Sequence, residues 1–256
     1  FIVHILTIFV LNKFLITGMP RSGTTVLINT LGKLDDVFVY SDSKGFGEPF
    51  KVMNKTLELN PYIRLDSVEK ECDSKYFGFK VFPNDLVNIE YLHNVKQYNT
   101  FVIIRKDIWK AIFSHALAKQ TLFINNLDIF AGSSTLHPHD SKYDKLSDIP
   151  PVLLREFKGA FFHRVKQCYE FETRWKNINI IYFEDLIKPD ASFDCLNEYF
   201  NKDIVFNLNY DNSHDSEAYY SNFSSSALHN LAAYFIKTID IPNDCPGYIR
   251  DSIYKY

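Results

Sequence analysis

The segment from Phe14 to Thr25, FLITGMPRSGTT, constrains the fold of this chain more than any other. An apolar run of the kind that forms a buried strand ends at Gly18, and a loop bounded by Gly23 leads into apolar residues from Val26 onward. Glycine permits positive φ angles and close backbone approach, and the first turn of a following helix directs amide groups at an anion. The segment therefore predicts a strand, an anion-binding loop and a helix.

The two glycines have the spacing of a phosphate-binding P-loop, but Thr24 stands where nucleotide hydrolases place a lysine. Without that lysine the loop is poorly equipped to hold β- and γ-phosphates together with magnesium. Arg21, Ser22, Thr24 and Thr25 still suit one phosphate-sized group, because their side chains donate hydrogen bonds to its oxygens. The alternative for this segment alone is an ordinary strand-turn-helix corner rich in small residues.

A second basic site is predicted in the segment from Thr100 to Thr121, TFVIIRKDIWKAIFSHALAKQT. Its first residues are β-branched and apolar, as in a strand that is buried on both faces, and they end at Arg105 and Lys106. Helical periodicity follows and places Asp107 and Ser114 on one polar face. Ser114 then lies on the order of 10 Å along the helix, a gap that an arginine and a phosphate bridge together. The alternative is a solvated helix start with an incidental serine.

Together the two segments resemble the sulfotransferases that use 3′-phosphoadenosine 5′-phosphosulfate (PAPS), and the second is most similar to bacterial carbohydrate sulfotransferases of the nodulation-factor and trehalose type. In that family a PRSGTT-like loop binds the 5′-phosphosulfate, and a basic residue at a strand end binds the 3′-phosphate with a serine about two helical turns later. Ser114 follows Lys106 by eight positions and Arg105 by nine, so the sequence leaves both as candidates. Downstream, the strand-like run from Asn179 to Phe183 leads into Glu184-Asp185-Leu186, which is similar to the family's YEDL element.

The resemblance implies that PAPS is the sulfuryl donor, that its product is 3′,5′-adenosine bisphosphate (PAP), and that no metal ion is required. The acceptor is expected to be a hydroxyl of a carbohydrate or glycolipid, contacted by the loops at 41–60 and 121–150. The donor-binding residues that the resemblance implies are Arg21, Ser22, Gly23, Thr24, Thr25, Arg105, Lys106 and Ser114.

Sulfuryl transfer needs a base for the acceptor proton and positive charge where the departing phosphate develops negative charge. Glu48, in GFGEPF, matches the glutamate before proline that carbohydrate sulfotransferases carry near the acceptor, and it is the candidate general base. Lys80, in YFGFKVF, resembles the strand lysine that reaches the sulfuryl region in the family. A lysine in so apolar a run is costly unless its ammonium finds an anion. Lys80 and Arg21 are therefore the candidate electrostatic pair.

Each assignment has an alternative. Glu48 has Lys44 and Lys51 nearby as ion-pair partners, and Lys80 has the option of snorkelling from an edge strand. Histidine is the base in small-molecule sulfotransferases, which makes three residues competitors: His115, His137 and His139. For the whole chain, the alternatives are a P-loop nucleotide or small-molecule kinase, which Thr24 disfavours, and a catalytically silent nucleotide-binding module.

Strand-like runs alternate with helical patterns along the chain, near 14–18, 36–40, 76–82, 100–104 and 179–183. This alternation predicts a three-layer, P-loop-like α/β fold, with a mostly parallel central sheet flanked by helices and the ligand at the carboxyl ends of the strands. A chain of 256 residues that is 46% hydrophobic is long enough for one such domain, expected to span 1–256. Helices are predicted over Leu153 to Trp175 and from Ser224 onward, with apolar faces turned inward.

The formal net charge of −3 and the lack of a basic run disfavour a nucleic-acid-binding protein. The four cysteines have no paired spacing and are expected to be reduced thiols in a cytoplasmic setting. Residues 1–11 are apolar but too short to span a bilayer, so they predict an edge strand or the remnant of an anchor. An anchor would place the domain in the Golgi lumen, where the sequons at Asn54 and Asn222 are usable. The sequence leaves membrane contact and the oligomeric state open.

Overall fold

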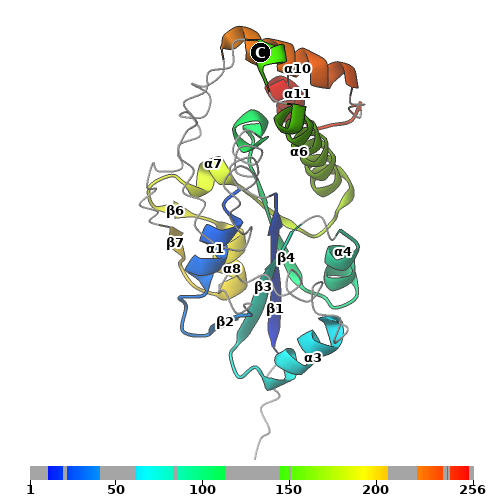
Figure 1. Ribbon diagram of the computed structural model, residues 1–256. Coiled ribbons are helices and arrows are strands. Elements are labelled where there is room, and N and C mark those ends of the chain that lie inside the picture. The colour runs from blue at the N-terminus through cyan, green and yellow to red at the C-terminus, as the bar shows by residue number, and fades with distance from the viewer. Residues whose placement is uncertain are drawn as a thin grey trace, which may run out of the picture.

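A computed structural model describes residues 11–19, 22–40, 61–82, 86–112, 145–149, 151–206, 224–238, 241 and 243–253. At its centre lies a sheet of five strands, all parallel, in the order β2-β3-β1-β4-β5 (Figure 1). The predicted α/β class and parallel sheet are confirmed, and the strand bounds differ from the predicted ones by one or two residues. The strands are β1 (Asn12–Gly18), β2 (Val37–Val39), β3 (Tyr76–Val81), β4 (Asn99–Ile104) and β5 (Asn179–Tyr182).

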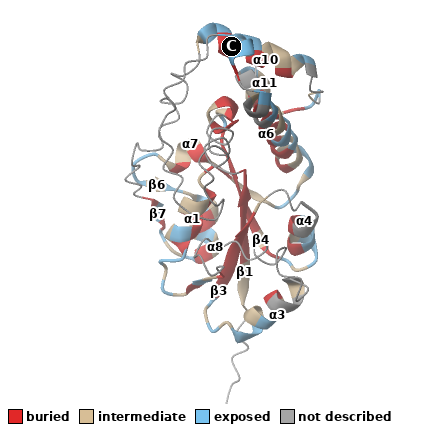
Figure 2. Ribbon diagram, viewed as in Figure 1, coloured by how far each residue is buried: buried red, intermediate tan, exposed pale blue. Residues whose placement is uncertain are grey.

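Successive side chains of a strand point to opposite faces, and here both faces are covered by helices. Phe14 and Ile16 of β1 pack on the face that α1 (Thr24–Leu31) and α8 (Asp194–Phe200) cover. Leu15, between them, packs on the other face with α3 (Pro61–Glu71) and α4 (Leu86–Asn94). The strands are accordingly the most buried part of the molecule in Figure 2. The sheet with a helical layer on either side is the predicted three-layer arrangement.

A third apolar cluster joins β4 to the long helix α6 (Pro151–Tyr169) and to α10 (Ser225–Thr238) and α11 (Gly247–Ile253). The α-helical hydrogen bonding ends at Tyr169 and gives way to a π-helical turn, Glu170–Arg174, closed by a bond of 3.1 Å from Trp175 N to Glu170 O. The inward faces predicted for both long helices are confirmed by the buried residues Phe157, Phe161, Val165, Cys168, Leu228, Leu231 and Phe235.

Short elements follow β5. The helix α7 (Phe183–Leu186) begins directly at the end of that strand, and β6 (Ala191–Ser192) pairs antiparallel with β7 (Val205–Phe206). The helix α8 begins at Asp194, because Phe193 before it has extended backbone angles. A 3-10 turn, Leu146–Asp148, precedes α6.

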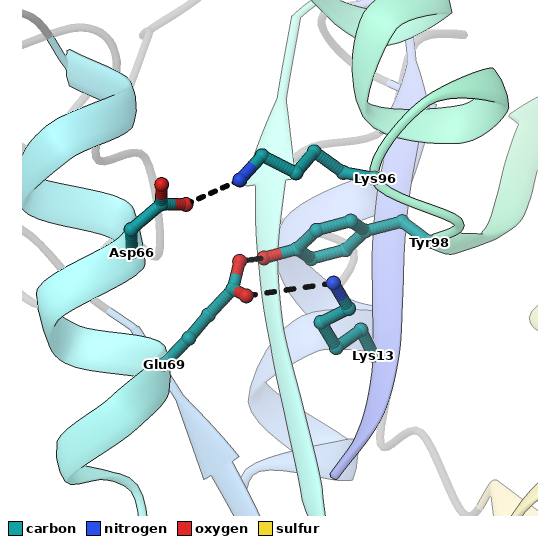
Figure 3. Close-up of polar contacts among 5 residues, drawn as sticks. All are labelled: Lys13, Asp66, Glu69, Lys96 and Tyr98. Carbon is teal, nitrogen blue, oxygen red and sulfur yellow. Dashed lines mark hydrogen bonds and ion pairs between the residues drawn. The ribbon is translucent and has the colours of Figure 1, made fainter.

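The amino edge of the sheet is held by charged side chains and a tyrosine (Figure 3). Glu69 of α3 accepts a hydrogen bond from the Tyr98 hydroxyl and another, 3.4 Å long, from Lys13 of β1. Asp66, one turn earlier, pairs with Lys96. Burial, followed by the bond to Glu69, raises the pKa of Tyr98. These contacts fasten α3 to the starts of β1 and β4, at the opposite end of the strands from the glycine loop.

None of the helices in the described ranges combines the length and the apolar character that a membrane crossing requires. All four cysteines are free thiols. The extent of the single domain and the nature of residues 1–10 stay predictions, and residues 1–10 lie outside the described ranges.

Candidate functional site

The loop after β1 requires glycine at both of its ends. Gly18 has φ +152°, and a Cβ at this position would lie 2.4 Å from the carbonyl oxygen of Ile103 in the neighbouring strand β4. Gly23 precedes α1 with φ +86°, and a Cβ there would lie 2.8 Å from a ring carbon of Phe183. Other residues would clash at both positions and would favour different backbone angles at Gly23. The packing around both ends of the loop thus favours glycine at each of them.

Lys80 reaches this loop from β3. Its Nζ donates a hydrogen bond of 2.9 Å to Oγ1 of Thr25 in the first turn of α1, and only 1% of the residue is exposed. The aromatic ring of Phe82 lies 5.2 Å from the same nitrogen. Since β3 lies between β2 and β1 and the lysine is buried, the snorkelling alternative is wrong. The ammonium group therefore lies at the carboxyl edge of the sheet, beside the first turn of α1.

Arg164 of α6, which is distant in the sequence, also contacts this loop. Its Nη1 donates a hydrogen bond of 2.7 Å to Oγ of Ser22, and it is 1% exposed. Burial lowers the pKa of Arg164 to about 10, and the positive charge of Arg105 contributes to the shift. Sequence reasoning missed this residue. The signal was present, because position 164 falls on the apolar face that carries Phe161 and Cys168, where a cation is unexpected.

The predicted second basic site lies at the end of β4, the strand beside β1. Arg105 is 8% exposed, and its guanidinium carbon lies 4.8 Å from the centre of the Phe183 ring. Lys106 is exposed and places its Nζ 3.8 Å from the centre of the Tyr182 ring. The two basic residues therefore point to different neighbours.

The helix after this site begins later than its polar pattern predicts. Asp107 is not part of the helix at 108–112, and its carboxylate caps the helix by accepting a bond of 2.9 Å from the amide of Lys110. Aspartate is favoured at such a position because its oxygen satisfies an amide that lacks an intrahelical partner. Asp107 therefore caps the start of this helix.

The segment predicted to be similar to a YEDL element lies between the two basic sites. Glu184 of α7 accepts bonds of 3.0 and 3.1 Å from the backbone amides of Lys106 and Asp107. Phe183, one residue earlier, fills the space beside Gly23. The short helix α7 therefore contacts both the glycine loop and the end of β4.

A further polar network, formed by Tyr248 and Glu172, interacts electrostatically with Lys106. The Tyr248 hydroxyl of α11 donates to the carboxylate of Glu172 in the π-helical turn. Burial raises the pKa of Glu172, while its bond from Tyr248 and the charge of Lys106 oppose the rise. Burial also raises the pKa of the Cys168 thiol to about 11. Lys106 thus stands near a carboxylate of the protein itself.

The parallel sheet brings the strand ends and their loops to one edge. Among the predicted site residues that the structure describes, those gathered there are Ser22, Gly23, Thr24, Thr25, Lys80, Arg105 and Lys106. The others, including the competing histidines, lie outside the described residues: Arg21, Glu48, Ser114, His115, His137 and His139. Within the described ranges no group of three or more His, Cys, Asp or Glu side chains is arranged to hold a metal ion.

No protein-family model matches the chain, and no curated protein matches it. Among solved structures, the chain is similar to the crystal structure of a sulfotransferase from Alicyclobacillus acidocaldarius, with a TM-score of 0.46 and 14% sequence identity. The match covers 88% of this chain and 92% of that one. At this identity and TM-score the match carries no argument about function. The assignment of the site rests on the residues described above.

Proposed function

We propose that this chain is a sulfotransferase that moves a sulfuryl group from PAPS to a hydroxyl of a carbohydrate or glycolipid. The observation that carries the proposal is the convergence of two buried cations, Lys80 and Arg164, on hydroxyls of one glycine-bounded loop. Two cations and two hydroxyls gathered at one loop form a positively charged, hydrogen-bonding environment that suits an anionic group. The loop lacks the P-loop lysine at Thr24, which favours a single terminal anionic group over a magnesium triphosphate.

The residues present suit the two charged ends of the donor. The loop amides, Ser22, Thr25 and Lys80 would hold the 5′-phosphosulfate, which supplies an activated sulfuryl group when bound. For the 3′-phosphate we favour Arg105 over Lys106. Arg105 is buried against Phe183, which also contacts Gly23, whereas Lys106 lies over Tyr182 on the side of Glu172.

The chemical roles follow from the same proposal. Glu48 removes the proton from the acceptor hydroxyl while the hydroxyl oxygen of the acceptor forms its bond to sulfur. The electron pair of the broken sulfur–oxygen bond remains on the 5′-phosphate, where Lys80 and Arg21 stabilise the added charge. Ser114 joins Arg105 at the 3′-phosphate. Glu48, Arg21 and Ser114 are proposed from the sequence resemblance.

Calorimetric titration with PAP tests the donor assignment. The full chain is expected to bind PAP without magnesium and more tightly than it binds 5′-AMP, because only PAP carries a 3′-phosphate. Magnesium-dependent ATP binding in place of this pattern would support the kinase alternative and overturn the proposal.

Transfer of labelled sulfate from PAPS to a panel of sugars and glycolipids separates an enzyme from a silent nucleotide-binding module. Within that assay, Glu48→Gln is expected to abolish transfer while His115→Ala retains it. The reverse pattern would assign the base to histidine.

A further inference from the structure

We propose that Ser22 and Thr25, beside the start of α1, form a donor-only site that selects a terminal oxyanion without protons and so distinguishes a sulfuryl from a phosphoryl group. The inference rests on the proposed function and gives a physical basis for its choice of donor. It is carried by the bonding of the two loop hydroxyls, Ser22 and Thr25.

A hydroxyl group has one proton to donate and two lone pairs with which to accept. Guanidinium and ammonium groups only donate, so Oγ of Ser22 accepts from Arg164 and Oγ1 of Thr25 accepts from Lys80. Each hydroxyl then has its own proton left to give. Within the described part of the chain, neither hydroxyl donates a hydrogen bond to another group of the protein. The two buried cations therefore fix both hydroxyls as donors toward whatever the loop binds.

The backbone around these hydroxyls also donates. The first bond within α1 runs 3.1 Å from the amide of Leu27 to the carbonyl of Gly23, so the amides at positions 24–26 precede the intrahelical ladder. Amides at the start of a helix are a common anion-binding group. Side chains and backbone together thus offer hydrogen-bond donors to the bound group.

The charged groups described around the loop lie on β3, on α6, after β4 and on α7. Lys80 of β3, Arg164 of α6 and Arg105 after β4 are cations, and arginine and lysine are ordinarily protonated across the neutral range. The carboxylate of Glu184 is occupied by two backbone amides. An acceptor-only oxyanion matches this environment.

The two kinds of terminal group differ in the protons that they carry. A sulfuryl ester is a strong acid and has no proton on its terminal oxygens near neutral pH. A terminal phosphoryl group has a second pKa of about 6 and carries a proton in an increasing share of molecules below it. The proton of a P–O–H group finds no acceptor among donors, and its oxygen accepts more weakly than an oxyanion, which weakens binding. The preference for sulfuryl should therefore grow as the pH falls.

Adenosine 5′-phosphosulfate and ADP form a matched pair for the test, because they differ only in the terminal group and both lack a 3′-phosphate. Binding of each to the full chain is measured at about pH 5.5 and about pH 8, on either side of the phosphate pKa. We expect the phosphosulfate to bind about tenfold more tightly at the lower pH, and the ratio of the two affinities to shrink at the higher pH.

Substitutions at Arg164 locate the effect. Arg164→Lys keeps a donor opposite Ser22 and should retain the preference, whereas Arg164→Gln offers an amide oxygen that accepts the Ser22 proton and should reduce it severalfold. Circular dichroism of each variant establishes that it is folded, and the wild-type pH comparison stands alone if one is not.

The outcomes separate this inference from the proposed function. Equal affinities for the two ligands at both pH values, or no binding of either, would overturn the donor-only site. Tight PAP binding together with equal affinities would leave the sulfotransferase proposal intact. A third outcome is a clear preference for adenosine 5′-phosphosulfate over ADP together with equal affinities for PAP and 5′-AMP. That outcome would support the donor-only site and count against PAPS as the donor.

Discussion

The guanidinium of Arg105 lies over the face of the Phe183 ring, 4.8 Å from its centre. The same ring fills the space beside Gly23, where a Cβ would lie 2.8 Å from it. One aromatic side chain therefore contacts both the glycine loop and the basic residue proposed for the 3′-phosphate. A change in this ring is expected to alter the position of one relative to the other.

Phe183→Leu is expected to reduce the preference for PAP over 5′-AMP by about threefold or more, because a cation–π contact of about 0.5–2 kcal/mol is lost. Titration of both nucleotides measures the preference. Phe193→Leu is the matched control, since Phe193 packs edge to face with Phe206 of β7 and, among the described residues, has no recorded contact with Arg105 or Lys106. An equal loss in the control would show that the effect is one of general packing.

Glu184→Gln is expected to lower the free energy of unfolding by about 1–3 kcal/mol, because the new amide nitrogen would face a backbone amide that needs an acceptor. Denaturant unfolding measures the loss. Asp185→Asn, at the next position, removes only a partner of Lys188 in an exposed pair and should cost less than about 1 kcal/mol. Similar losses in the two variants would contradict a bracing role for the Glu184 carboxylate.

Lys80→Met is expected to abolish sulfuryl transfer while lowering the melting temperature only a little. Methionine has a similar length and fills the same buried space, whereas the hydrogen bond to Thr25 is lost. Thermal unfolding and the transfer assay, performed on the same preparation, separate the two effects. A variant that melts early would indicate that Lys80 serves the fold and not the proposed chemistry.

Stability should depend on pH through Glu172. Burial raises its pKa in the folded state, so folding favours the protonated carboxyl, and a penalty develops as the pH rises from the ordinary value of 4.5 through the folded value. Glu172→Gln, which retains an acceptor for Tyr248, is therefore expected to be more stable than the wild type at neutral pH, with the difference vanishing in acid. Unfolding at about pH 3.5 and about pH 7 measures it, and a constant difference would contradict the assignment.

Residue Glu170 provides a control for that comparison. It belongs to the same π-helical turn and pairs with Arg174, whose side chain is 63% exposed. Exposed pairs contribute about 0–1 kcal/mol, so Glu170→Gln should change stability little at either pH.

The sequence predicted the parts of the fold that local patterns determine. Apolar runs marked the five strands, and the glycines of the loop marked the turn at Gly18 and the start of α1 at Gly23. The burial of Lys80 was also predictable, because a cation inside YFGFKVF has no polar neighbour in the sequence.

What could not be predicted depends on contacts between distant segments. The bond between Arg164 and Ser22 joins residues 142 positions apart, and only the place of Arg164 on an apolar helix face hinted at it. The choice between Arg105 and Lys106 as the proposed 3′-phosphate ligand depends on their contacts with Phe183 and Tyr182. These two aromatic residues lie at the junction of β5 and α7. The hydrogen bonds from the amides after β4 to Glu184 could not be predicted either. In the sequence, Glu184 looks like any other acidic residue that follows a strand.

The order of the strands has a consequence for how such a chain can diversify. Strand β1 occupies the middle of the sheet, with the strand of Lys80 on one flank and that of Arg105 on the other, while β2 and β5 form the margins. Insertions and exchanges beyond the margins leave this central trio undisturbed. If the proposed function holds, relatives of this chain can change their acceptors by remodelling peripheral segments while the strands that carry the proposed donor site stay the same.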